Sequence, residues 1–253
     1  METELEKLKE KIALIAGGST GIGLATAKRF VDEGAYVYVT GRRQDQLESA
    51  VREIGSKVTE FRGDVASAED SARLFAQIQR EKGRLDILFA NAAIAEFGLL
   101  GDYTEEHLER HFNINVKGLV FTVQGALPLL PNNATIVLNA SIVSVKSFEN
   151  LGVYNATKAA VRSFARTWTG ELKSRGIRVN VVSPGTIGTP GFSKMAGNPQ
   201  TEDLMKAQMK AVIPMGRLGD ADEIAKAVLF LASDDSSYVA GVELFVDGGF
   251  VAV

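Results

Sequence analysis

The residues best suited to proton transfer are Tyr154 and Lys158, which stand four positions apart. On a helix this spacing is one turn, so the phenol and the ammonium group share a face. A phenol titrates near pH ~10 and is a poor acid or base at neutrality. A neighbouring ammonium group stabilises the phenolate, so we expect Lys158 to lower the pKa of Tyr154. Ser141 ends the preceding predicted strand and is expected to hydrogen-bond a substrate oxygen as negative charge develops there.

A glycine-rich turn follows the first predicted strand and opens the first predicted helix. Glycines let the backbone approach a pyrophosphate closely, and the helix N-terminus offers N–H groups and a positive dipole end to the anion. No Lys-Ser/Thr pair closes the turn, so it is not a P-loop. The turn predicts a dinucleotide site that uses Gly17, Ser19, Thr20, Gly21, Ile22 and Gly23.

The end of the second predicted strand indicates which dinucleotide is bound. Sites for NAD usually carry an Asp or Glu about 20 residues after the glycines, bonded to the ribose 2′-hydroxyl. Here Gly41 takes that position and is followed by Arg42 and Arg43. Guanidinium groups match a phosphate in charge and geometry, which predicts NADP(H) over NAD(H). Asp45 is an alternative acidic residue, but it lies beyond the strand end.

The elements that must position these residues alternate along the whole chain. Short apolar runs rich in β-branched residues predict strands at 12–16, 36–40, 58–61, 87–90, 135–139, 178–182 and 243–246. Helical periodicity predicts helices at 21–33, 45–54, 68–81, 105–130, 155–175 and 221–232. Such alternation favours an α/β fold, a single-domain doubly wound Rossmann fold over residues 1–253 with a seven-stranded parallel sheet flanked by helices.

One long stretch, residues 184–199, is rich in Gly, Pro, Ser and Thr and is predicted to be irregular. Loops of this length in a compact domain are usually functional. We expect a substrate lid at about residues 184–215, with Met195, Met205 and Met209 lining either an apolar pocket or the core.

The spacing Gly-x-x-x-Gly-x-Gly, joined to Tyr-x-x-x-Lys and Ser141, resembles the short-chain dehydrogenase/reductase family. The resemblance implies a catalytic tetrad of Asn115, Ser141, Tyr154 and Lys158, in which Asn115 holds a water that relays protons to the lysine. The sequence departs from the family pattern at Ala16, where Thr is usual. It departs again at Ala90 and Ala93, which replace Asn and Gly.

The same resemblance extends the cofactor site beyond the glycine turn. It implies that Asp64 and Val65 lie beside the adenine, although Asp64 could equally cap a turn. It implies further cofactor contacts from Asn91, Ala92, Tyr154, Lys158, Pro184, Gly185, Ile187 and Thr189.

The chain most resembles bacterial NADPH-dependent carbonyl reductases and secondary alcohol dehydrogenases, partly through residues 164–169. The resemblance therefore implies an oxidoreductase that interconverts ketones or aldehydes and alcohols by hydride transfer, and assembly as a homotetramer. Two alternatives stay open: a 3-oxoacyl-acyl-carrier-protein reductase, which uses the same residues, and a non-catalytic NADP-binding sensor.

Composition excludes other classes of function. The net charge of −3 offers no electrostatic basis for nucleic-acid binding. The absence of cysteine excludes disulfides and thiolate chemistry, and no apolar run is long enough for a membrane span. We therefore expect a cytoplasmic protein that binds no membrane. His107 and His111 have helical spacing for a metal, but no third ligand accompanies them in the sequence, so no metal site is expected.

Overall fold

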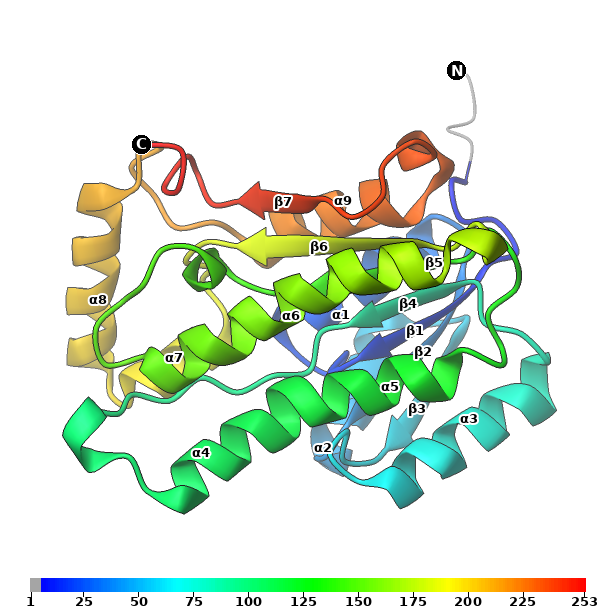
Figure 1. The fold of residues 1–253 in the computed structure, drawn as a ribbon, viewed down its shortest axis with the longest axis horizontal. Helices are drawn as coiled ribbons and strands as arrows, with labels where there is room; N and C mark the ends of the chain where they lie inside the picture. Colours follow the sequence, from blue (N-terminus) through cyan, green and yellow to red (C-terminus); the bar gives the residue numbers. More distant parts are fainter. Residues whose placement is uncertain (1–5) are drawn as a thin grey trace.

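The structure is a computed structural model that describes residues 6–253. The first five residues of the expected domain lie outside the described residues. Seven strands form one fully parallel sheet in the order β3-β2-β1-β4-β5-β6-β7 (Figure 1). The strands are β1 (Ile12–Ala16), β2 (Tyr36–Gly41), β3 (Val58–Arg62), β4 (Ile87–Ala90), β5 (Thr135–Asn139), β6 (Arg178–Pro184) and β7 (Glu243–Val246). The predicted fold class is confirmed.

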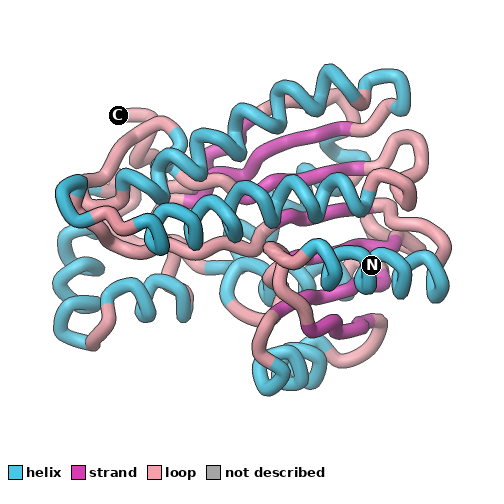
Figure 2. Tube along the Cα trace, turned by 60° about the horizontal axis from the view of Figure 1, so that its bottom comes forward, coloured by secondary structure: helices cyan, strands magenta, loops and turns pink. Residues whose placement is uncertain are grey.

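Helices cover both faces of the sheet, as Figure 2 shows around the magenta strands. They are α1 (Gly21–Asp32), α2 (Gln44–Ile54), α3 (Ala68–Lys82), α4 (Glu105–Phe112), α5 (Gly118–Ala126), α6 (Gly152–Glu171), α7 (Pro190–Ala196), α8 (Pro199–Val212) and α9 (Ala221–Ala232). One apolar core packs α3, α5 and α6 against one face, and a second packs α1, α2 and α9 against the other. The inner strands are therefore apolar on both sides, which explains why they are continuous apolar runs without alternation.

The strand order reverses beside β1, which pairs with β2 on one side and β4 on the other. The helices that follow β1 and β4 pack on opposite faces of the sheet, so the chain diverges at the carboxyl ends of these two strands. Ligands of open α/β sheets bind at such a point. The glycine turn after β1 and the segment beginning at Asn91 after β4 both lie there.

Two predicted elements differ from the structure. The helix expected over 105–130 is interrupted by a π-helical turn, Asn113–Lys117, between α4 and α5. The stretch 184–199, expected to be irregular, contains α7, which begins because the Thr189 hydroxyl accepts a hydrogen bond from Phe192 N and Pro190 occupies the first helical turn. In Figure 1, α8 lies beyond the arrowheads of β6 and β7. Within residues 6–253, no helix is long and apolar enough to span a membrane.

Candidate active site

Tyr154, Lys158 and Ser141 come together at the carboxyl ends of β5 and β6, as predicted. Tyr154 and Lys158 lie one turn apart near the N-terminus of α6, and Lys158 Nζ lies 5.7 Å from the centre of the Tyr154 ring. Ser141 follows β5 and caps the short 3₁₀ turn Ile142–Ser144, where its Oγ accepts a hydrogen bond from Val143 N. Ser141 also lies beside Tyr154, close enough for its hydroxyl to interact with the phenol and to lower the pKa of Tyr154.

The pKa of Tyr154 differs from the expectation. Burial raises it to about 12, and the hydroxyl of Ser141 only partly opposes this. The prediction that Lys158 lowers the pKa of Tyr154 is therefore wrong for the protein alone. At neutral pH the phenol keeps its proton, which is the form that a proton donor needs.

The state of Lys158 explains the difference. Its side chain is buried, 2% exposed, and burial lowers its pKa to about 7. Its Nζ donates a hydrogen bond of 2.7 Å to the carbonyl oxygen of Asn139. A lysine that is only partly protonated at neutrality provides a weak positive field for the phenolate.

Asn139 is a member of the site that the sequence analysis missed. Its Nδ2 donates to Oδ1 of Asn91 at 2.9 Å, and Asn91 Nδ2 in turn donates to the carbonyl oxygen of Gly17 at 2.9 Å. These bonds connect Lys158 to the glycine turn across three strands. The one available signal is the amide side chain at the end of β5, directly after three apolar residues.

Asn115 lies in the middle of the π-helical turn and is buried. Its Oδ1 accepts from Ile94 N at 2.8 Å, and its Nδ2 donates to Ile94 O and to Thr157 Oγ1. Both ends of the amide are used, so the side chain ties the segment after β4 to α6. The site residue is thus a structural link between these elements, and π turns of this kind are frequent at functional sites.

The glycine turn has the form expected of a phosphate site. Gly17 has φ +72°, and a side chain there would lie 2.9 Å from the Cα of Ala92. A side chain on Gly23 would overlap the carbonyl oxygen of Gly17. Within residues 6–253, no side chain caps the first turn of α1 after Thr20, and that turn has no acidic residue. Its N–H groups are therefore available to an anion, as a pyrophosphate requires.

The glycine turn after β1 lies next to the end of β2 and to the loop that follows β6. Ser19 Oγ lies 2.9 Å from the position that a side chain on Gly41 would take, so Ser19 lies beside the end of β2. Thr189, from the loop after β6, lies 3.4 Å from the corresponding position on Gly21. Ile22 is the second residue of α1 and packs against the core cluster of α1, α2 and α9. The turn is thus enclosed from both sides.

The two arginines lie at the expected end of β2. Arg42 is 57% exposed, and its Nη1 lies 4.0 Å from Oδ2 of Asp64. Asp64 accepts a hydrogen bond from Ala66 N, so it does cap a turn, and it borders a pocket with Val65 and Thr40. Arg43 precedes α2 and is exposed. The arginines have no strong partner among residues 6–253 beyond this long ion pair, which leaves their guanidinium groups accessible.

The loop after β6 is held close to the end of β7. Gly185 N donates to Val246 O at 3.0 Å, and a side chain on Gly185 would lie 2.7 Å from the Cα of Asp247. Ile187 is buried and pairs with Gly219. Pro184 ends β6, so the predicted residues of this loop all lie along the carboxyl edge of the sheet.

An apolar wall surrounds Tyr154. It consists of the buried cluster of Ile142, Val143, Ile213 and Phe250, with Phe148, Tyr154 and Met209 packed against it. Met209 comes from α8, so the region after β6 contributes to this wall. These apolar side chains exclude water from the phenol, which agrees with the raised pKa of Tyr154.

Comparisons with known proteins agree with this geometry. Residues 16–251 match the family described as Enoyl-(Acyl carrier protein) reductase. The chain is 40% identical to the oxidoreductase asL5 of Sarocladium schorii, over 98% of this chain and 99% of that one. It is 36% identical to the NADP-dependent (R)-specific alcohol dehydrogenase of Lentilactobacillus kefiri, over 98% and 99% of the two chains.

The fold also matches a solved structure. The crystal structure of L-sorbose reductase from Gluconobacter frateurii, complexed with NADPH and L-sorbose, superposes with a TM-score of 0.92 at 30% identity, covering 98% of this chain and 99% of that one. The chain belongs to the short-chain dehydrogenase/reductase family of oxidoreductases, whose fold binds a nicotinamide cofactor.

Proposed function

We propose that the protein is an NADP(H)-dependent oxidoreductase that interconverts ketones or aldehydes and the corresponding alcohols. The observation that carries the proposal is the position of Tyr154, one turn from Lys158 on α6 and beside Ser141, at the carboxyl edge of the sheet. NADPH, when bound, supplies the hydride that reaches the carbonyl carbon. The residues of the chain supply position and the proton.

Ser141 and Tyr154 act on the substrate oxygen. Ser141 donates a hydrogen bond to the carbonyl oxygen and stabilises the negative charge that develops as the carbon is reduced. Tyr154 then gives its proton to that oxygen, so the carbonyl becomes an alcohol and the phenol becomes a phenolate. In the opposite direction the phenolate takes the proton back.

Lys158 restores the phenol. Its pKa of about 7 makes it able to hold and release a proton at neutrality, and its position one turn from Tyr154 brings that proton close. It also holds the ribose of the cofactor. Asn115 acts through its backbone and a bound water, because its side chain already binds Ile94 and Thr157.

The cofactor preference rests on the end of β2. Gly41 leaves no carboxylate to bind the ribose 2′-hydroxyl, and Arg42 and Arg43 offer two accessible guanidinium groups to a 2′-phosphate. The names of two relatives, one NADP-dependent and one solved with NADPH, support the same preference. Asp64 and Val65 border the pocket next to the arginines, where we place the adenine.

Residues 1–253 act as one domain, and residues 184–215, which include α7 and α8, cover the substrate as a lid. The molecule works as a homotetramer. The apolar wall around Tyr154 favours ketones over charged substrates.

A second substrate class follows from a specific relative. The chain is 35% identical to the 3-oxoacyl-acyl-carrier-protein reductase of Thermotoga maritima over 97% of its length. The same Ser141, Tyr154 and Lys158 would reduce a 3-oxoacyl thioester. Ketones and an acetoacetyl thioester should therefore be assayed together.

The deciding experiment compares Tyr154→Phe with the wild type. Turnover of NADPH with a panel of ketones should fall by roughly 10²–10⁴-fold in the variant, while NADPH affinity, measured by fluorescence, stays within about twofold. Tyr238→Phe, at a fully exposed tyrosine, is the matched control and should keep wild-type turnover. Wild-type activity in Tyr154→Phe would reject the mechanism. A wild-type protein that binds NADPH but reduces no member of the panel would favour a sensor.

A further inference from the structure

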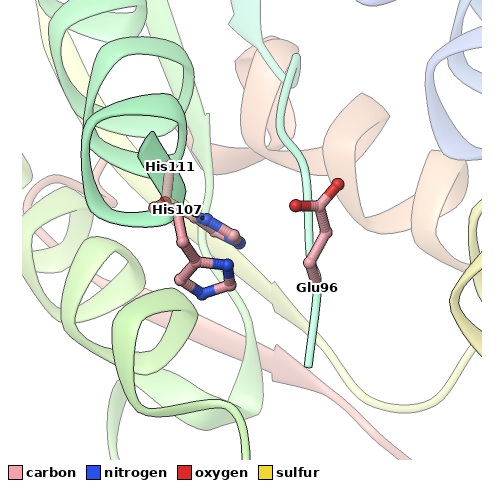
Figure 3. A group of neighbouring side chains, drawn as sticks. All are labelled: Glu96, His107 and His111. Carbon is pink, nitrogen blue, oxygen red and sulfur yellow. Dashed lines mark hydrogen bonds between the residues drawn. The ribbon is translucent and has the colours of Figure 1, made fainter. Parts of the chain in front are cut away.

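Glu96, His107 and His111 form a cluster outside the site described above (Figure 3). Glu96 lies in the segment after β4, and both histidines lie on α4. One ligand atom from each residue lies within 4.8 Å of the others. The sequence shows no third ligand next to His107 and His111, so the expectation of no metal site does not take account of Glu96, which the fold brings to the pair.

His111 has a defined tautomer. Its Nδ1 lies 2.8 Å from the carbonyl oxygen of His107, and a carbonyl oxygen only accepts, so Nδ1 must carry the hydrogen. The other nitrogen, Nε2, therefore carries a lone pair. This atom is buried and has no hydrogen-bond partner among residues 6–253.

An unpartnered acceptor at a fully buried position needs an explanation. Metal-binding histidines commonly donate their second ring nitrogen to a backbone carbonyl, which fixes the ring and its tautomer. His111 has that arrangement, and its ring lies beside His107 and Glu96 (Figure 3). The ring centres of His107 and His111 are 4.4 Å apart, and His107 stacks on Tyr103 at 5.7 Å.

Glu96 has one neighbour that must be considered. Its Oε1 forms an ion pair with Arg110, on the same helix as the histidines. A carboxylate has two oxygens, and a ligating carboxylate is itself usually hydrogen-bonded. Arg110 therefore orients Glu96 and leaves its second oxygen for a cation.

We infer that Glu96, His107 and His111 hold a divalent transition-metal ion, with Zn²⁺ as the best match. Two imidazole nitrogens and one carboxylate oxygen are common zinc ligands and leave a fourth position for water or another ligand. Ca²⁺ and Mg²⁺ prefer sites made of oxygen ligands, so they fit this site poorly.

The metal would strengthen a connection that the fold already has. Asn115 binds the backbone of Ile94, two residues before Glu96, and lies one turn beyond His111. A bound ion would therefore join the same two segments, the one after β4 and the helix that leads to Asn115. We expect Zn²⁺ to raise the melting temperature of the protein.

The chain allows a clean test, because His107 and His111 are its only histidines and it has no cysteine. Untagged protein, treated with chelator and desalted, should bind one equivalent of Zn²⁺ by calorimetry. Zn²⁺ should also shift both histidine ring signals in the NMR spectrum. Binding is measured without turnover, so the result does not depend on the proposed oxidoreductase activity.

Variants separate a three-ligand site from weak surface binding. Glu96→Gln and His107→Gln change partly exposed side chains and should each weaken Zn²⁺ binding by at least about tenfold, since loss of an outer-shell partner alone costs about 10–100-fold. Glu109→Gln, at an exposed position of α4, should bind as the wild type does. Wild-type affinity in Glu96→Gln, unshifted histidine signals, or no saturable binding would overturn the inference.

Discussion

Lys158 Nζ donates to the backbone carbonyl oxygen of Asn139, and this contact is the first of three bonds that lead to the glycine turn. The side chain of Asn139 bonds Asn91, and Asn91 bonds Gly17. The proton-transfer residues and the phosphate turn are thus parts of one connected polar structure inside an apolar sheet. Such networks hold their members in fixed positions, and here Oδ1 of Asn139 is the one atom of these side chains that is buried without a partner among residues 6–253.

The buried amine should make stability depend on pH. The pKa of Lys158 falls from 10.5 in the unfolded chain to about 7 in the fold, so between these values only the unfolded chain holds the proton. The free energy of unfolding should therefore rise with pH from about 7 to 10, by at most about 1.4 kcal/mol per pH unit. Tyr154, whose pKa is raised, opposes this only above pH 10.

Lys158→Met should remove this contribution. Urea unfolding of the wild type and of the variant from pH 7 to 10, without cofactor, gives the slope of the free energy of unfolding against pH for each protein. The other titrating groups are the same in both proteins, so their contributions cancel when one slope is subtracted from the other. Equal slopes in the two proteins would contradict the lowered pKa of Lys158.

The guanidinium groups after β2 should decide between the two dinucleotides. Arg42→Ala and Arg43→Ala should each raise KM for NADPH about tenfold, which is the loss of one charge-assisted hydrogen bond. KM for NADH should change little. Steady-state kinetics with both cofactors checks this, with Arg52→Ala, on the exposed side of α2, as the control. If both variants kept the wild-type ratio of KM for NADH to KM for NADPH, the basis for the NADP(H) preference would be removed.

Two glycine substitutions should have opposite effects. A methyl group on Gly23 would overlap the carbonyl oxygen of Gly17, so Gly23→Ala should destabilise the protein by about 1–3 kcal/mol and weaken NADPH binding. Gly170, near the end of α6, has open space around that position. Gly170→Ala should stabilise the protein by about 0.5–1 kcal/mol. Thermal and urea unfolding measure the stability of both variants. Equal changes in the free energy of unfolding would contradict the inference that a side chain on Gly23 overlaps the carbonyl oxygen of Gly17.

Asn115 should be needed for folding as well as for turnover. Asn115→Ala leaves the half-buried backbone N–H and C=O groups of Ile94 without their side-chain partners, which should cost about 1–3 kcal/mol, and kcat should fall as well. Thr157→Ser keeps the hydroxyl that Asn115 contacts and should cost about 1 kcal/mol or less. Urea unfolding and kcat measure both. Unchanged stability in Asn115→Ala would argue against this link.

The fold could be predicted because its strands are buried on both faces and therefore stand out as apolar runs between helical periods. The site residues Ser141, Tyr154 and Lys158 could be predicted because helical and strand-end spacing brings them together. Whether they are the catalytic residues awaits the Tyr154→Phe experiment.

Other features depend on tertiary structure. The pKa of Tyr154 depends on how much water the surrounding elements exclude, which spacing does not give. Glu96 lies 11 residues from His107 in sequence, so only the course of the chain after β4 shows that they meet. Asn139 was missed because an amide in a buried strand has meaning only through its partners in neighbouring strands.

The π-helical turn at Asn113–Lys117 gives the helices on either side of it different rotational phases. One residue corresponds to about 100° of rotation in an α-helix. Before the turn, α4 directs His107 and His111 toward the segment after β4, whereas after it α5 directs Leu119 and Val123 into the core. A single-residue deletion that restored regular α-helix would therefore rotate either the histidines of α4 or the apolar side chains of α5 away from the residues that they contact. The π-helical turn allows one nearly continuous helix to contact two parts of the fold that lie in different directions.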